Sequence, residues 1–424
     1  MRLRKGWGRL GMSFSEWKDV RLGDVITFNP RESISKKQMA KKIAMEKLKP
    51  FTKFIDSYEL TEFNGGTKFR NGDTLLARIT PCLENGKTSQ VTILDDNEVG
   101  FGSTEYIILR EKVGITNKDY IYYLSISPKF RDIAIKSMVG SSGRQRVQQD
   151  MLENTEVLLP SLAVQEAIAD TLSCLDNKIE LNNRINKTLE EMAQAIFKSW
   201  FVDFEPFQDG EFEDSELGMI PKGWRVGTIG DYVNVKSGFA FKSAWWKDSG
   251  IPVIKIKNIG NNTIDFNDCS FVENDKVDYA KDFKVSGGDL LIAMTGATIG
   301  KFAIVPQLYT TMLVNQRVGK FFLGDNPILK IPFIYGVLNL EYVQEAIITR
   351  GTGSAQPNIS PTALETIKLI LPTEEIIEQF NSLECNLFSE IIRNQEENQM
   401  LTEMRDSLLP KLMSGEIRVP TEEV

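Results

Sequence analysis

Histidine is absent from this chain of 424 residues. It is the side chain most often used as a general base near neutral pH, and the commonest metal ligand. Its absence excludes Ser-His and Cys-His nucleophile arrangements. A carboxylate-based or magnesium-dependent enzyme would still be compatible with the sequence, but the expectation of catalysis is lowered.

Cysteine is scarce, and long apolar runs are missing. The four cysteines, Cys82, Cys174, Cys269 and Cys385, are far apart and form no C-x-x-C pair. This spacing predicts neither a zinc site nor a disulfide framework, and it favours the cytoplasm as the compartment. No stretch approaches the roughly 18–20 apolar residues that a membrane helix needs. Residues 1–12 are basic but lack the apolar centre of a secretory signal, so we interpret them as a lead-in.

The net charge of −8 hides an uneven distribution of charge. Residues 1–160 contain 26 Lys and Arg against 20 Asp and Glu, and residues 211–372 contain 16 against 17. The excess acid lies in residues 161–210, with 4 against 9, and in residues 373–424, with 4 against 12. Because local patches decide affinity for DNA, the acidic total does not exclude a nucleic-acid partner.

The second half of the chain repeats the first. Gly287–Ala293 matches Asn71–Ala77, and Ile370–Pro372 matches Leu158–Pro160. Within residues 13–160, β-branched and aromatic runs predict several short strands, and Asn117–Val139 predicts a helix. The predicted strands are Val20–Phe28, Gly72–Ile79, Gln90–Leu94, Glu105–Leu109 and Glu156–Leu159. Such a repeat indicates a duplication but says little about chemistry.

The repeat predicts an α+β fold in four segments. Residues 1–160 form a first mixed α/β domain, and residues 161–210 form a central long helix that acts as a spacer. Residues 211–372 form a second mixed domain, and residues 373–424 form a C-terminal long helix. Each helix is over 30 residues long, or ~50 Å at 1.5 Å per residue, and needs a partner for its apolar stripe.

The two helices carry matching heptad patterns, so each is the natural partner of the other. The first pattern consists of Ile168, Leu172, Leu175, Ile179, Asn182, Asn186, Leu189, Ala193, Ile196 and Trp200. The second consists of Phe380, Leu387, Ile391, Asn394, Asn398, Leu401, Leu408 and Leu412. We call these eighteen positions the helix seam.

An antiparallel coiled coil with pseudo-two-fold symmetry would place Asn182 opposite Asn398 and Asn186 opposite Asn394. Buried asparagines cost stability but penalise every register that sets them against leucine. The pairing would therefore fix both the orientation and the axial offset of the helices. The alternative is a broader bundle, with the asparagines at its edge and Leu181 and Ile185 in its core.

Residues 294–301, M-T-G-A-T-I-G-K, superficially resemble a phosphate-binding P-loop. The spacing is one residue short, and Phe302 stands where Ser or Thr should coordinate magnesium. A loop whose glycines allow close backbone approach and whose Lys301 contacts a DNA phosphate is the better interpretation.

Two polar loops occupy equivalent places in the two repeats and are candidates for reading DNA bases. Arg, Gln and Asn side chains have the bidentate edges that recognise guanine and adenine in the major groove. The first loop contains Ser142, Gly143, Arg144, Gln145 and Arg146, and the second contains Ser354, Gln356 and Asn358. Weaker candidates are Arg78, Lys87, Lys236, Lys242, Thr298, Gln316 and Arg317, because a lone polar loop residue is usually only solvated.

The chain resembles a known family, the specificity (S) subunits of Type I restriction–modification systems. The similarity extends from about Trp17 to Val419. It is carried by residues 197–204 (F-K-S-W-F-V-D-F), 215–224 (S-E-L-G-M-I-P-K-G-W) and 408–417 (L-L-P-K-L-M-S-G-E-I). The resemblance implies two target-recognition domains that each read half of a bipartite DNA site, with the paired helices as a ruler between them.

The resemblance also implies partners. Two modification subunits would dock on the helices and methylate adenine with S-adenosylmethionine, and restriction subunits would add ATP- and magnesium-dependent translocation. No cofactor, metal or membrane is expected for this chain itself, and no methyltransferase motif, Walker A motif or nuclease carboxylate cluster is found in it. A non-catalytic adaptor that binds proteins rather than DNA is the main alternative, and a divergent magnesium nuclease is a more distant one.

Overall fold

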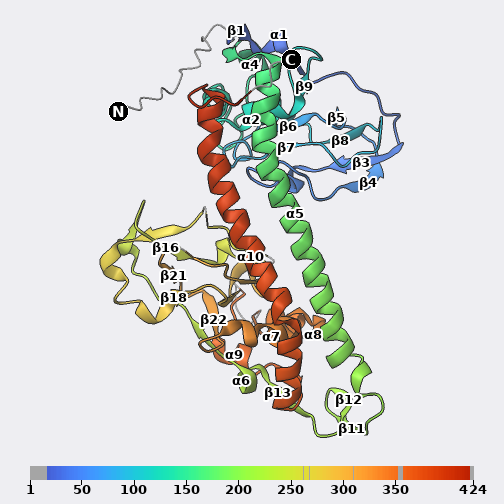
Figure 1. Cartoon of the computed structure of the whole chain (residues 1–424), viewed down its shortest axis with the longest axis vertical. Helices are drawn as coiled ribbons and strands as arrows, with labels where there is room; N and C mark the ends of the chain where they lie inside the picture. Colours follow the sequence, from blue (N-terminus) through green and yellow to red (C-terminus); the bar gives the residue numbers. More distant parts are fainter. Residues whose placement is uncertain (1–16, 261, 267, 309, 352–356, 421–424) are drawn as a thin grey trace, which may run out of the picture. The chain divides into compact units, whose positions relative to one another are not determined.

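The computed structural model describes residues 17–260, 262–266, 268–308, 310–351 and 357–420 (Figure 1). The chain forms two compact units, Met1–Glu180 with Met400–Val424, and Leu181–Gln399. Two helices of forty residues, α5 (Leu162–Phe201) and α10 (Glu374–Met413), each contribute to both units. Within the described ranges, no helix is long and apolar enough to cross a membrane.

Unit 1 contains two four-stranded sheets and one strand pair. The first sheet has the order β2 (Ile26–Phe28), β9 (Tyr106–Glu111), β6 (Thr74–Ala77) and β7 (Thr88–Gln90). The second has the order β4 (Glu59–Glu62), β3 (Met39–Ile43), β8 (Gly100–Gly102) and β5 (Thr67–Phe69). Strand β1 (Lys18–Arg21) pairs with β10 (Glu156–Leu159). The helices are α1 (Leu22–Val25), α2 (Lys118–Ile126), α3 (Pro128–Lys136) and α4 (Gln149–Glu153), with a 3-10 turn η2 (Met45–Lys47).

Unit 2 repeats this plan with additions. Its first sheet has the order β14 (Asn234–Ser237), β22 (Val318–Phe322), β19 (Leu290–Ala293) and β20 (Phe302–Ile304). Its second has the order β15 (Trp246–Lys247), β17 (Ser270–Val272), β16 (Ile251–Ile254), β21 (Met312–Val314) and β18 (Lys284–Val285). Strand β13 (Arg225–Thr228) pairs with β23 (Lys368–Leu371), and the hairpin β11 (Phe212–Ser215) and β12 (Gly218–Pro221) precedes them.

The remaining elements of unit 2 are helices. They are α6 (Ile229–Tyr232), α7 (Ile331–Asn339), α8 (Glu341–Gly351) and α9 (Pro361–Glu365), with 3-10 turns that include η5 (Ile256–Asn258) and η8 (Gly296–Thr298). Each second sheet contains a parallel pair at the same place, β3 with β8 and β16 with β21. The sheet orders therefore confirm the predicted duplication of a mixed α/β domain.

Three of the predicted elements have wrong limits. Residues 20–28 are not one strand, because a helical turn, α1, separates β1 from β2. Residues 91–94 follow strand β7 instead of forming a strand. Residues 117–139 form two helices, because Pro128 cannot continue α2 and instead begins α3, which Ser127 caps through its hydroxyl.

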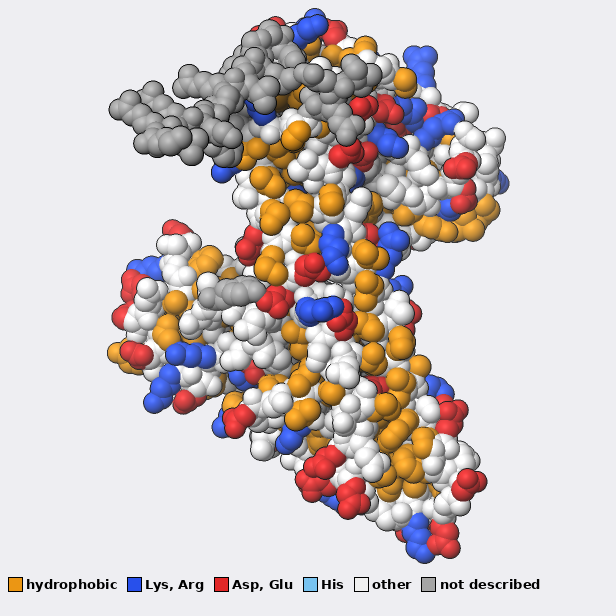
Figure 2. Space-filling view, in the orientation of Figure 1, with side chains coloured by type: hydrophobic (Ala, Val, Ile, Leu, Met, Phe, Trp, Pro, Cys, Tyr) orange, Lys and Arg blue, Asp and Glu red, His pale blue; other side chains and the backbone are white. Residues whose placement is uncertain are grey.

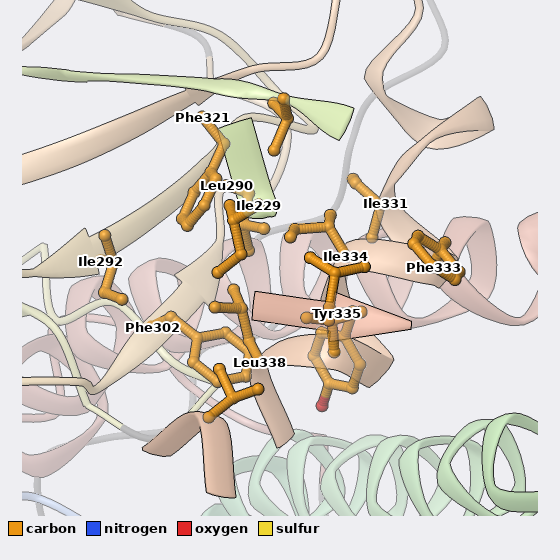
Figure 3. Close-up of a cluster of buried hydrophobic side chains, with 14 of the residues drawn as sticks. Ile229, Leu290, Ile292, Phe302, Phe321, Ile331, Phe333, Ile334, Tyr335 and Leu338 are labelled. Atoms are coloured by element: carbon orange, nitrogen blue, oxygen red, sulfur yellow. The ribbon is translucent and has the colours of Figure 1, made fainter. Parts of the chain in front are cut away.

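The core of unit 2 lies between its first sheet and helices α7, α5 and α10. Leu290, Ile292 and Phe302 from the sheet are buried against Ile334 and Leu338 of α7 (Figure 3). The same cluster includes aromatic side chains of both long helices, notably Phe197, Phe201, Phe380 and Phe388. The domain and the helix pair of this unit thus share one hydrophobic core.

The helices pair antiparallel in unit 2. Asn394 Nδ2 donates a hydrogen bond to Asn186 Oδ1 at 2.9 Å, and Asn182 Nδ2 donates one to Asn398 Oδ1 at 3.0 Å. At the far end of this segment, the rings of Trp200 and Phe380 have centroids 5.6 Å apart. The two asparagine contacts match the predicted pairing, and Asn182, Asn186 and Asn394 are buried.

In unit 1 the same two helices continue the pairing in the same sense. Ile168, Leu172 and Leu412 are buried in one cluster with the adjoining domain. A buried ion pair that the heptad pattern did not predict joins Arg405 Nη1 of α10 to Asp176 Oδ1 of α5 at 2.8 Å. Tyr123 donates its hydroxyl proton to the other oxygen of Asp176 at 2.6 Å.

The broader-bundle alternative is wrong. Leu181 is 50% exposed and Ile185 is 36% exposed, so neither fills a core in the described residues. All eighteen helix-seam positions, by contrast, are buried or half-buried.

Candidate nucleic-acid interface

Two loops of unit 1 that are distant in the sequence lie side by side. One is the loop after β6, residues 78–87, and the other is the turn of residues 139–147. Thr80 N donates to Gln145 O at 3.0 Å, and Val147 N donates to Arg78 O at 2.9 Å. The structure therefore brings together the two groups of residues that the sequence predicted separately in this half.

The predicted side chains of unit 1 differ in how available they are. Ser142, Gly143 and Arg144 are exposed at the tip of the turn, where Gly143 has a φ of 77° that favours glycine. Gln145 is half-buried beside them. The tip is thus the part of this loop that is free to meet a partner.

Other predicted residues of unit 1 are already engaged. Arg146 makes a bidentate contact with the carboxylate of Glu105, with Nη2 at 2.7 Å from Oε1 and Nε at 2.9 Å from Oε2. This contact lowers the pKa of Glu105 below its usual value. Lys87 donates from its ammonium to Met45 O at 3.0 Å. Arg78 is half-buried at the end of β6, and its Nε has no hydrogen-bond partner among the described residues.

Four loops of unit 2 converge in the equivalent place. Met294 N donates to Arg317 O at 3.0 Å, and Ile359 N donates to Met294 O at 2.9 Å. Gln316 N donates to Phe239 O at 2.9 Å, which adds the loop after β14. The loop after β19 therefore lies against the loops of Arg317 and Ile359, and the loop after β14 joins this group through Gln316.

The predicted side chains of unit 2 fall into three groups. Exposed at the converging loops are Lys301, Gln316, Arg317 and Asn358. Thr298 is half-buried, and its hydroxyl donates to Ile256 O at 3.4 Å. Lys236 and Lys242 are exposed but lie over aromatic rings, 4.7 Å from the Phe322 centroid and 5.5 Å from the Trp245 centroid. Ser354 and Gln356 lie outside the described residues.

The loop of residues 294–301 does not have P-loop architecture. Its helical part is the three-residue turn η8, and strand β20 follows at Phe302. A P-loop instead begins a helix whose N-terminus binds the phosphates. In the parts of the chain that the structure describes, no group of three or more Asp, Glu or Cys side chains could hold a metal ion.

The sequence reasoning missed an aromatic cluster beside the interface loops of unit 2. Phe239 stacks on Trp245, with an interplanar angle of 8° and centroids 6.0 Å apart, and Tyr279 lies 5.6 Å from Trp245. The sequence F-A-F-K-S-A-W-W-K at 239–247 was the signal that could have indicated it. The cluster supports the loop after β14, from which Phe239 reaches Gln316.

Comparison with known proteins agrees with this architecture. Residues 14–191 and 221–396 each match the family model described as Type I restriction modification DNA specificity domain. The chain is 30% identical over 310 residues to the MjaIX specificity subunit of Methanocaldococcus jannaschii, covering 71% of this chain and 69% of that protein. It is 25% identical over 478 residues to the EcoAI specificity subunit of Escherichia coli, covering 91% and 80%.

A solved structure has the same fold. The S subunit of the Type-I restriction-modification system from M. genitalium aligns with a TM-score of 0.54 at 17% identity, covering 95% of this chain and 98% of that one. The class of protein follows from the family model, which describes a DNA specificity domain and matches both repeats. With both repeats matched, the chain belongs to the Type I restriction modification DNA specificity family.

Proposed function

We propose that this chain reads a two-part DNA target with a gap of fixed length, as the specificity subunit of a Type I restriction–modification complex. Each mixed domain would read one part. The observation that carries the proposal is that the same loops converge in both units while their exposed side chains differ. In the turn of residues 139–147 of unit 1 Arg144 is exposed, and in the equivalent loop of unit 2 Asn358 is exposed. Arg317 of unit 2 is also exposed, at the place where unit 1 has the half-buried Glu105.

The chemistry of these side chains suits base recognition. Arginine binds the O6 and N7 edge of guanine with two hydrogen bonds, and glutamine binds adenine in the same way. Each such contact contributes roughly 1–3 kcal/mol of discrimination against a wrong base. Two domains with the same scaffold and different exposed residues would therefore read different half-sites.

The chain would read the target without catalysing a reaction on it. Its relatives are named as specificity subunits of Type I restriction enzymes, and the chain contains no histidine. S-adenosylmethionine, ATP and magnesium would be bound by modification and restriction subunits rather than by this chain. The complex would act on double-stranded DNA in the cytoplasm.

The modification subunits would dock on the outer face of α5. Leu181, Ile185 and Met192 share one side of this helix by their spacing, and they are 50%, 36% and 46% exposed. Figure 2 shows hydrophobic side chains along this part of the helix surface. Exposed apolar stripes of this kind mark interaction sites.

Co-expression with the cognate modification subunits, followed by genome-wide sequencing of methylated adenine, tests the proposal. The expected result is one motif with two half-sites and one gap. The adaptor alternative predicts no methylated motif, together with no salt-dependent DNA binding by the complex. Either of those outcomes would overturn the proposal.

Point changes at the exposed loop residues should separate the two half-sites. Arg317→Ala is expected to relax one base position of one half-site, and Arg144→Ala is expected to relax one position of the other. Each loss corresponds to about fivefold to 150-fold in discrimination, at roughly 1–3 kcal/mol per contact. The two variants are matched controls for each other, because each should leave the other half-site unchanged in the methylation map. Relaxation of both half-sites by one change would contradict the assignment.

A further inference from the structure

Each domain has a residue in the left-handed backbone conformation at the same position. Phe51 follows η2 by four residues, and Asn262 follows η5 by four residues. Their φ angles are 51° and 56°. A bulky residue such as phenylalanine rarely adopts this conformation, so its recurrence at equivalent positions calls for a physical reason.

In unit 1 the carbonyl of this residue is bound by the helix pair. Arg405 Nη1 of α10 donates to Phe51 O at 3.2 Å. The same nitrogen donates to Asp176 of α5, and the Arg405 side chain is only 5% exposed. Two residues further on, Lys53 donates to Ser173 Oγ of α5 at 2.8 Å. The segment is thus tied to both long helices.

In unit 2 the equivalent carbonyl, that of Asn262, also accepts a hydrogen bond from α10, but the donor is a different residue type. Gln395 Nε2 of α10 donates to Asn262 O at 3.0 Å. The side chain of Asn262 donates from Nδ2 to Glu190 Oε2 of α5 at 3.0 Å. Here the left-handed residue itself contacts both helices, whereas in unit 1 Phe51 contacts α10 and Lys53 makes the contact with α5.

The same residues also support the candidate DNA loops. Phe51 N donates to Gly86 O at 2.9 Å, directly before Lys87. A side chain at Gly86 would meet the Phe51 ring at 2.5 Å, so the ring packs closely on this loop. Asn262 N donates to Phe302 O at 3.0 Å, directly after Lys301. In each domain the anchored residue therefore lies between the helices and a predicted DNA-contact loop.

We propose that Arg405 and Gln395 are positioning residues, which fix the place of each recognition domain along the helix pair through these two carbonyls. They would thereby help to set the number of base pairs between the half-sites. The inference rests on the proposed function, because a gap between half-sites exists only if both domains read DNA. The number of base pairs between the half-sites would then depend on these two side-chain contacts as well as on the length of the helices.

The test uses the full chain with its modification subunits and the methylation map. Gln395→Met removes the donor to Asn262 O at nearly constant volume. Arg405→Lys keeps a positive charge beside Asp176 but loses the guanidinium that reaches Phe51 O. Gln379→Met, at an exposed position of the same helix, is the matched control.

Both half-sites are expected to stay unchanged in the two variants. Methylation at gaps one base pair longer or shorter should rise about fivefold, the effect of losing one ordinary hydrogen bond. The control should keep a single gap. Thermal unfolding shows whether each variant is folded. If one of them is not, the methylation map of the other variant tests the inference.

A purely structural role would lower thermal stability and leave a single gap. A single gap in each variant that folds, with wild-type chain giving a clear two-part motif, overturns this inference while leaving the proposed function intact. Absence of any two-part motif with the wild-type chain would instead count against the proposed function itself.

Discussion

At the scale of single residues, Glu384 is the most unusual ionisable group in unit 2. Its side chain lies on α10 at 1% exposure, and neither carboxyl oxygen has a hydrogen-bond partner among the described residues. Burial raises its pKa from 4.5 to about 8. The folded protein therefore favours the protonated carboxyl, because the charged form cannot be solvated there.

This pKa predicts a pH-dependent stability. Between pH 4.5 and about 8 the folded chain holds a proton that the unfolded chain releases. The contribution of Glu384 is therefore fully present below pH 4.5 and is lost as pH rises to about 8. We expect a decrease of at most about 5 kcal/mol in the free energy of unfolding over this window, and less where the surroundings of the charge relax.

Denaturant unfolding at several pH values measures this effect. Glu384→Gln cannot ionise, so its difference from the wild-type chain should grow with rising pH. Glu378→Gln, at an exposed position on the same helix, should show no such trend. Parallel pH profiles for wild type and Glu384→Gln would show that another group is responsible.

The candidate interface shows what residue types alone can and cannot predict. Arg144 and Arg146 have the same side chain, two positions apart, and the sequence gives no ground to separate them. The structure pairs Arg146 with Glu105, forty-one residues away, and leaves Arg144 exposed. Whether an arginine side chain is available to a ligand depends on its partners in the tertiary structure, and a local sequence pattern does not show these partners.

At the scale of elements, the long helices were the most predictable part of the fold. Their heptad pattern extends over many turns, so each position supports the same periodicity. Even the hydrogen bond between Asn186 and Asn394 follows from the antiparallel register. The ion pair between Asp176 and Arg405 was not predicted, because charged residues at such positions usually remain on the solvated face.

The limits of the strands were less predictable, because a short strand contains too few residues to show a clear alternation of apolar and polar side chains. Strand β7 begins at Thr88 and ends at Gln90, where residues 90–94 were expected. Both segments contain β-branched residues, and only pairing with β6 selects between them. Tertiary context commonly overrides strand propensity in this way.

The asparagine pair gives a test of the helix register. Asn394→Leu should lower the free energy of unfolding by roughly 1–3 kcal/mol, because Asn186 loses its partner within a buried contact. The double change Asn186→Leu and Asn394→Leu should be more stable than either single change, since two leucines pack together. Urea unfolding of the four chains gives the coupling energy. If the double change lowered the free energy of unfolding by the sum of the two single changes, the direct pairing of these residues would be contradicted.

At the scale of the whole molecule, the duplication produced two units that share a scaffold and differ in their loops. The sheet orders and the anchored residues at 51 and 262 recur in both units. Among the residues that the structure describes, the exposed side chains of the converging loops do not recur. A scaffold held constant while its loops change allows one protein to read two unrelated short sequences.

The helices should then determine the gap independently of the loops. Inserting one heptad at matched places in both α5 and α10 keeps the seam in phase, because seven residues return the apolar stripe to the partner. The insertion lengthens each helix by ~10 Å at 1.5 Å per residue, which is about three base pairs of duplex. The methylated motif should keep both half-sites and gain about three base pairs of gap. Inserting the heptad in one helix only is the control, and it should abolish methylation because the asparagines lose register. An unchanged gap in the double insertion would mean that the helix pair does not set the distance.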